Sequence, residues 1–189
     1  MLDSKALRNR IREIVKHIWM NEIRQDYDNS LLIGEDTFKN ALYYHLRKYL
    51  KYEFEVENIR VYTEYYIRDA KAKADLFIGY LNPETIKGFE ETREWYNIKE
   101  AVEPLAIFEL KYKNYFKAHK DFISDFIKVK EKYEKSDELP KCDYYIAHIS
   151  ECNLEKLLFV DKAHKKNFFI TELAAMWDNK NEEMIWDFH

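Results

Sequence analysis

Three short segments rich in β-branched and aromatic residues constrain the fold of this chain most strongly. They cover residues 59–67, 72–80 and 105–113. The polar run from Arg68 to Lys71 separates the first two, and Pro104 precedes the third. Short apolar segments bounded by polar residues are typical of β-strands. We therefore expect three consecutive strands, with a meander as their simplest arrangement.

Helical periodicity surrounds these strands. Residues 4–27 place apolar side chains at helical spacing, with Ser4 as a candidate N-cap, and residues 35–50 carry a second such stripe. The pattern after the third strand predicts a helix at 116–136, a strand at 143–149, a helix around 154–158 and a strand at 167–171. This order predicts a mixed α/β domain with a central mixed sheet flanked by helices.

The chain is long enough for one such domain with appendages. We expect an N-terminal helical extension (1–33), a core (34–173) whose insertion at about 82–103 holds a short helix, and a C-terminal tail (174–189) without clear structure. No apolar run approaches the roughly 18 residues of a membrane span, and the first residues lack the apolar block of a signal peptide. A cytoplasmic protein is therefore expected.

Composition and motif content argue against several functional classes. With three glycines there is no Gly-rich phosphate loop, the histidines and two cysteines show no metal-binding spacing, and no GxSxG motif occurs. The net charge of −4 counts against a protein that coats nucleic acid by bulk electrostatics. It leaves room for a local basic surface.

Charged residues suited to catalysis lie on the second and third predicted strands. Glu109 and Lys111 are two positions apart, so a carboxylate and an ammonium project from one face of their strand. Asp75 lies near the start of the preceding strand. If Tyr80 pairs with Pro104 in an antiparallel ladder, Asp75 falls opposite Glu109, and the three groups converge.

Two carboxylates held this closely repel each other unless a cation lies between them. Carboxylates, a backbone carbonyl and waters suit Mg²⁺, for which Mn²⁺ can substitute. Bound by Asp75 and Glu109, the metal would polarise a scissile phosphate and lower the pKa of a bound water, while Lys111 would orient that water or stabilise the phosphorane. Glu35, on the inward stripe of its helix, would add a metal or water contact. As a first-turn acid after Gly34, it would equally well serve only the helix dipole.

At these residues the sequence resembles the PD-(D/E)XK nuclease superfamily. Ala74-Asp75-Leu76-Phe77-Ile78 is similar to its catalytic aspartate strand, and Phe108-Glu109-Leu110-Lys111 is similar to its E-x-K strand. The resemblance covers residues 34–149 and implies a restriction-endonuclease-like αβββαβ core. It implies that Asp75 and Glu109 bind the metal, that Lys111 is the catalytic lysine and that Glu35 is the first-helix glutamate. Ala74 stands where many members have proline, and the insertion lengthens the interval from Asp75 to Glu109.

Basic residues after the third strand are candidate nucleic-acid contacts. Lys113, Lys117 and Lys120 would grip backbone phosphates beside aromatic residues that stack on bases. Lys128 resembles an auxiliary residue that several members of the superfamily place by the site, although a solvated pair with Asp125 is the simpler interpretation. A solvated loop followed by the first turn of a helix would show the same cluster. A nucleic-acid contact and a solvated surface therefore both stay open.

The sequence thus predicts a Mg²⁺-dependent nuclease that acts on DNA. The alternative is a catalytically inactive nuclease-fold protein that acts as a nucleic-acid-binding or protein-interaction module, which the acidic net charge supports. A third interpretation is a small DNA-binding protein that dimerises through its N-terminal helix and Trp-containing tail, because a small nuclease core often needs a second copy to cut both strands.

Overall fold

The N-terminal helix forms because its apolar residues recur on one stripe. It comprises α1 (Ser4–His17), a π-helical segment (Ile18–Ile23) and α2 (Arg24–Asp28), which confirms the helix predicted for residues 4–27. The stripe is buried at Ile11, Val15 and Trp19. This computed structural model describes residues 4–67, 71–92, 102–113, 142–152 and 170–189.

The second predicted helix is α3 (Glu35–Tyr49), and α4 (Lys51–Val56) follows directly after Leu50. Thr37 caps the start of α3. The Thr37 hydroxyl accepts hydrogen bonds from the N–H groups of Ile33 and Gly34, at 3.0 and 3.1 Å, and donates one to the Gly34 carbonyl at 2.9 Å. This cap fixes Glu35 in the first turn of the helix. The buried stripe of α3 includes Phe38, Leu42 and Leu46.

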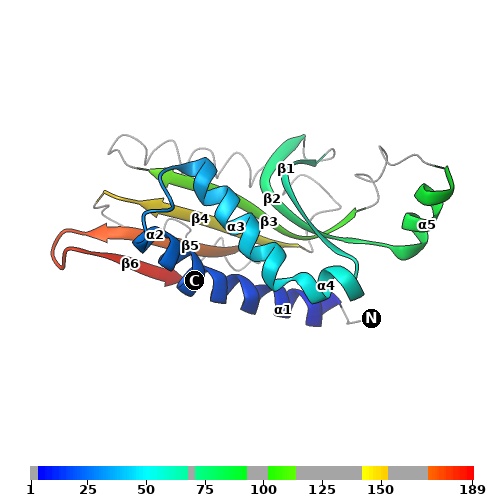
Figure 1. Ribbon diagram of the computed structural model, residues 1–189, viewed down its shortest axis with the longest axis horizontal. Coiled ribbons are helices and arrows are strands. Elements are labelled where there is room, and N and C mark those ends of the chain that lie inside the picture. Colours follow the sequence, from blue (N-terminus) through cyan, green and yellow to red (C-terminus); the bar gives the residue numbers. More distant parts are fainter. Residues whose placement is uncertain (1–3, 68–70, 93–101, 114–141, 153–169) are drawn as a thin grey trace.

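Six strands form one mixed sheet in the order β1-β2-β3-β4-β5-β6 (Figure 1). Their bounds are β1 Ile59–Ile67, β2 Ala72–Leu81, β3 Val102–Lys113, β4 Asp143–Ser150, β5 Ile170–Asp178 and β6 Glu183–Phe188. β1, β2 and β3 pair antiparallel, β3, β4 and β5 pair parallel, and β6 returns antiparallel to β5. The expected α/β class, the three-strand meander and the strand at 143–149 are confirmed.

The insertion contains the short helix that was expected there. This is α5 (Pro83–Thr92), which begins directly after β2 and lies away from α1 and α3 at the far end of the sheet (Figure 1). The predicted helices at 116–136 and around 154–158 fall outside the described residues.

The C-terminal part of the chain departs most from the prediction. The strand expected at 167–171 is β5, which runs from Ile170 to Asp178, and the expected tail (174–189) supplies most of β5 and all of β6. Leu173, Ala174 and Ala175 are fully buried. A strand covered on both faces is a continuous apolar run without the alternation that marks a half-exposed strand. This is why the periodicity of the sequence does not reveal its length.

Trp19 connects three distant parts of the chain. Its ring centroid lies 5.0 Å from that of Trp186 and 6.0 Å from that of Phe38, and its Nε1 donates a hydrogen bond to the Asp187 carbonyl at 2.9 Å. The N-terminal helix, expected as an extension, therefore packs into the same core as α3 and β6. Both helices cover one face of the sheet (Figure 1). Among the helices described, none is long and apolar enough to cross a membrane.

A buried ion pair attaches α1 to the start of β4. Arg12 Nη2 lies 3.1 Å from each carboxylate oxygen of Asp143. The Asp143 side chain is 2% exposed and that of Arg12 is 34% exposed. Burial raises the pKa of the Asp143 carboxyl, and the guanidinium groups of Arg12 and Arg8 oppose that shift. The core therefore holds this carboxylate next to the counter-charge that α1 supplies.

Arg12→Met should destabilise the protein by about 2 to 3 kcal/mol at pH 7, because it leaves the Asp143 carboxylate buried without this partner. Because the pKa of Asp143 is raised in the folded state, the protein loses stability as the pH rises from the unfolded-state pKa through the folded-state pKa. Removing Arg12 raises the folded-state pKa further. The cost should therefore shrink towards about pH 4. Chemical denaturation at several pH values measures it. Adding Asp143→Asn should recover most of the loss, and a cost that is equal at every pH would contradict this account.

Candidate functional site

Strands β2 and β3 part at one end of the sheet. They pair as far as Leu76 and Phe108, and beyond this point β2 pairs with β1 alone and β3 with β4 alone. We call this point, with residues 72–75 and 109–113 beyond it, the β2–β3 fork. Asp75 bridges the fork, because its Oδ2 accepts a hydrogen bond from the Leu110 N–H at 2.8 Å. The divergence thus holds a carboxylate between two strands.

The register predicted between these strands is wrong at the end away from the fork. Tyr80 pairs with Glu103 and not with Pro104, because the pairing shifts by one residue next to Gly79. A Cβ at Gly79 would overlap the neighbouring side chains, so the close approach of the strands requires glycine at this irregularity. Gly79, a glycine inside a strand pattern, is the signal that could have located the shift.

Nearer the fork the predicted register holds, and the predicted site residues come together there. The last pair before the fork sets Asp75 level with Glu109 at the next position. Lys111 Nζ lies 3.4 Å from Glu35 Oε1, with 21% of the Lys111 side chain and 39% of the Glu35 side chain exposed. α3 therefore brings Glu35 to the residues of β2 and β3.

The Asp75 carboxylate at the fork has a perturbed pKa. Burial raises its pKa, and the charge of Glu35 adds to the rise. The hydrogen bond from the Leu110 N–H and the positive charges of Lys111 and Lys39 act in the opposite direction without cancelling it. The ionised form of Asp75 is therefore less stable in the folded protein than in water.

The sequence alone does not single out two further charged residues at the fork, Lys39 and Glu64. Lys39 follows Glu35 by one helical turn and forms an ion pair with Glu64 of β1, which also contacts Lys73. The β1–β2 pairs on either side set Glu64 level with Asp75, and Glu64 adopts a φ of 54°. The i,i+4 spacing on α3 and the hairpin register are the signals that locate them.

A buried histidine–carboxylate pair lies next to Lys111. His148 is its partner in the parallel β3–β4 register, and His148 Nε2 lies 3.3 Å from Glu172 Oε1. The two side chains are 5% and 0% exposed. These residues were not predicted as part of the site. A histidine and a glutamate inside the apolar runs of β4 and β5 are the signal that could have found them.

Asp75 and Glu109 are the carboxylates at the fork that fit a divalent cation. Both are partly buried, and Oε1 of Glu109 is inaccessible to solvent, so a cation would offset two charges held out of bulk water. Mg²⁺ retains several waters and needs one or two carboxylates. Within the described ranges, no three acidic, histidine or cysteine side chains form a ready metal cluster, so water would complete the coordination.

The predicted nucleic-acid contacts lie mostly beyond the described residues. The backbone of Lys113 forms the end of β3. Lys117, Lys120 and Lys128 fall in residues 114–141, outside the described part of the chain. Their roles stay predictions.

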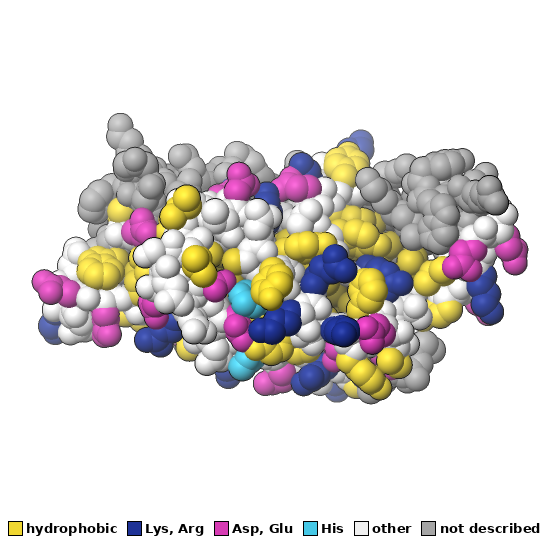
Figure 2. Space-filling model, viewed as in Figure 1, with side chains coloured by type: hydrophobic (Ala, Val, Ile, Leu, Met, Phe, Trp, Pro, Cys, Tyr) yellow, Lys and Arg dark blue, Asp and Glu magenta, His cyan; other side chains and the backbone are white. Residues whose placement is uncertain are grey.

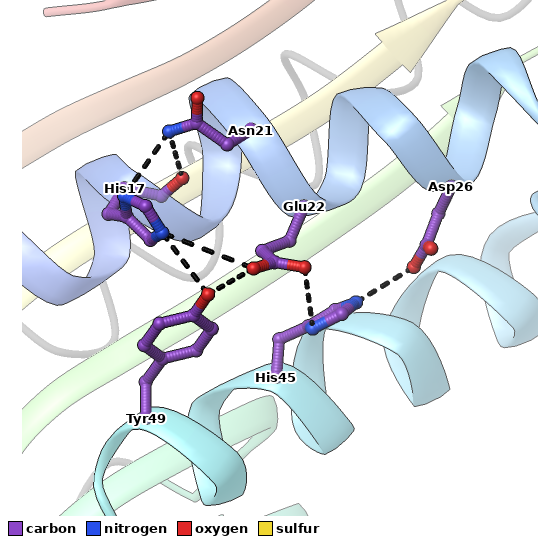
Figure 3. Close-up of polar contacts among 6 residues, drawn as sticks. All are labelled: His17, Asn21, Glu22, Asp26, His45 and Tyr49. Carbon is purple, nitrogen blue, oxygen red and sulfur yellow. Dashed lines mark hydrogen bonds and ion pairs between the residues drawn. The ribbon is translucent and has the colours of Figure 1, made fainter.

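A second polar cluster joins the N-terminal helix to α3 (Figure 3). The buried His45 lies between two acids, with Nε2 2.9 Å from Asp26 Oδ2 and Nδ1 3.6 Å from Glu22 Oε2. Tyr49 donates a hydrogen bond to the other Glu22 oxygen, and its hydroxyl lies 3.2 Å from His17 Nε2. Each acid of this cluster contacts a side chain of α3. The cluster therefore joins the N-terminal helix to α3.

No protein-family model matches this chain, and no curated protein matches its sequence significantly. The interpretation of the β2–β3 fork therefore depends on its own geometry and on the residues that form it.

Asp75→Asn should raise the Tm of the metal-free protein at pH 7. Because burial raises the pKa of Asp75, the ionised carboxylate lowers stability as the pH rises through its folded-state pKa, and a neutral amide removes this loss. The asparagine oxygen can still accept the Leu110 N–H. Thermal unfolding in EDTA measures the difference, which should vanish below about pH 4. Glu103→Gln, an exposed position on β3, is the control, and a lower Tm for Asp75→Asn at pH 7 would refute this reasoning.

Proposed function

We propose that this chain is a Mg²⁺-dependent nuclease that hydrolyses phosphodiester bonds in DNA, built on a restriction-endonuclease-like αβββαβ core. The observation that carries the proposal is the meeting of Asp75, Glu35 and Lys111 at the β2–β3 fork. These residues come from one helix and two strands, and they are the positions at which the sequence resembles the PD-(D/E)XK superfamily. The order of α3, the β1–β3 meander and a parallel β4 is consistent with that core.

Asp75 and Glu109 would hold the metal, whose contribution is to polarise the scissile phosphate and make a bound water more acidic. The Leu110 N–H fixes the orientation of the Asp75 carboxylate before any ligand arrives. Such preorganisation matters because the carboxylate does not have to be repositioned during the reaction. The buried surroundings of Asp75 strengthen its attraction for a cation.

Lys111 would act on the water and on the charge that develops at phosphorus. Hydrolysis adds a water oxygen to phosphorus, and the negative charge on the phosphate oxygens increases in the transition state. The Lys111 ammonium is partly exposed, so it can donate hydrogen bonds to the water or to a phosphate oxygen. Glu35 Oε1, 3.4 Å away, keeps the ammonium directed at the fork.

Replacement of Asp75 by Ala, Glu109 by Gln or Lys111 by Met should each reduce Mg²⁺-dependent DNA cleavage by at least about 100-fold. The reason is that the metal and the lysine each supply several kcal/mol to the transition state, and 1.36 kcal/mol is a factor of about ten. The assay measures cleavage of supercoiled, duplex and single-stranded DNA, and of RNA, in Mg²⁺, in Mn²⁺ and in EDTA. Glu103→Gln, on the same strand as Glu109 and Lys111, is the matched control and should keep full activity.

Two outcomes would contradict the proposal. One is wild-type protein that cuts no substrate of the panel with either metal, and the other is cleavage that the three replacements leave unchanged. The first outcome, combined with nucleic-acid or protein binding that survives all three replacements, would support the inactive binding module instead.

Glu35→Gln should lower cleavage by about 10-fold, because the residue acts through Lys111 and outer contacts of this kind typically contribute one to two orders of magnitude. Glu103→Gln, at an exposed position on β3, is again the control. Equal rates for the two variants would remove Glu35 from the site.

A further inference from the structure

A groove crosses the outer surface of α3 and α4. It has a volume of about 520 Å³. We call it the α3–α4 groove, and it is lined by three aromatic residues, three basic residues and one acid: Tyr43, Tyr44, Phe54, Arg47, Lys48, Lys51 and Glu55. Figure 2 shows Lys and Arg side chains gathered with hydrophobic ones on this face of the molecule, beside the histidines. The groove thus combines positive charge with aromatic surface.

The charge of the groove is positive although the whole chain carries −4. Its single acid, Glu55, lies 3.9 Å from Lys51, and both side chains are mainly exposed. Exposed pairs of this kind are loosely held and can be exchanged for another anion. Arg47 forms no ion pair with a carboxylate of the described residues; instead it donates a hydrogen bond to the Tyr43 hydroxyl at 3.2 Å. An anionic ligand would therefore find cations available here.

Guanidinium groups lie close to the aromatic rings of the groove. The Arg47 guanidinium lies 5.7 Å from the Tyr43 ring centroid and 5.6 Å from that of Phe54. The Arg60 guanidinium lies 4.3 Å from the Phe54 centroid. Tyr44 is 62% exposed at the rim. Flat cationic and aromatic faces of this kind accept the bases of an unpaired strand, because every base has a π-face.

A row of side chains on α3 connects the groove with the candidate site. Glu35, Lys39, Tyr43 and Arg47 follow one another at intervals of four residues, which places them on one inclined stripe that winds about 120° around the helix. At about 1.5 Å per residue, this stripe is about 18 Å long. It begins at the fork, where Glu35 contacts Lys111, and ends in the groove. A strand bound in the groove would therefore be aligned with the site.

We propose that the α3–α4 groove binds a single-stranded segment of nucleic acid and directs it along α3 to the β2–β3 fork. The proposal rests on the function proposed above, since the groove would bind the strand that the fork cleaves. An acidic protein segment would satisfy the cations, but it would not stack on the exposed Tyr44 ring. This ring, the guanidinium groups and the stripe leading to the fork favour nucleic acid.

Fluorescence anisotropy of a labelled oligothymidylate, with the full chain in EDTA, tests the groove without cleavage. Arg47→Gln combined with Lys51→Gln should weaken binding by about 10-fold and reduce the salt slope by about 1.4, because each cation that pairs with a phosphate of a single strand contributes about 0.7 to the slope. Tyr44→Ala should weaken binding by about fivefold or more and leave the slope unchanged, because stacking carries no charge. Lys87→Gln, an exposed position on the remote α5, is the matched control and should bind like the wild type.

The outcomes separate this inference from the proposed nuclease activity. Groove variants that bind the oligonucleotide like the wild type, with an unchanged Tm, would overturn the groove whether or not the protein cuts DNA. Competition by oligoglutamate as effective as competition by oligothymidylate would also overturn it and indicate an acidic protein partner. Loss of binding in the groove variants supports the groove even if Mg²⁺-dependent cleavage is never observed.

Discussion

The packing of Trp19 determines where the helices lie on the sheet. Its indole touches Phe38 of α3 and Trp186 of β6 and is tied by a hydrogen bond to the backbone at Asp187. Because interiors are close-packed, shifting this ring would move α3 relative to the strands beneath it. The approach of Glu35 to Lys111 and the slope of the α3 stripe both follow from that placement. A contact far from the fork in sequence thus sets the geometry of the fork.

Much of this fold is accessible from sequence because local patterns and tertiary packing agree. The stripe through Phe38, Leu42 and Leu46 is both a helical period and a buried surface, and β1 to β4 carry the residues that strands favour. The C-terminal strands differ. β5 is mostly apolar, so its length shows only when β4 and β6 flank it, and Trp186 in β6 packs against Trp19 and Tyr27 of the N-terminal helix. Pairing between distant segments is not visible in the local sequence pattern of either segment.

For the candidate site, the sequence predicts which residues meet but not how they are held. Glu109 and Lys111 follow from strand alternation, and Asp75 follows from a register that survives the shift at Gly79. The parting of β2 and β3, the Leu110 N–H bound to Asp75, and the Lys39–Glu64 ion pair depend on the curvature of three strands together. His148 and Glu172 join the neighbourhood only through parallel pairing, whose long connections a sequence pattern does not fix.

The π-helical segment rotates the residues after it around the axis of the N-terminal helix, relative to the residues before it. A π-turn holds one residue more than an α-turn, and each residue of an α-helix advances the face by about 100°. Without that extra residue, Trp19 could stay on the sheet only if the part after Ile23 rotated and carried Asp26 away from His45. Deleting one residue from this segment would thus break the contact between Asp26 and His45 while Trp19 stays in the core.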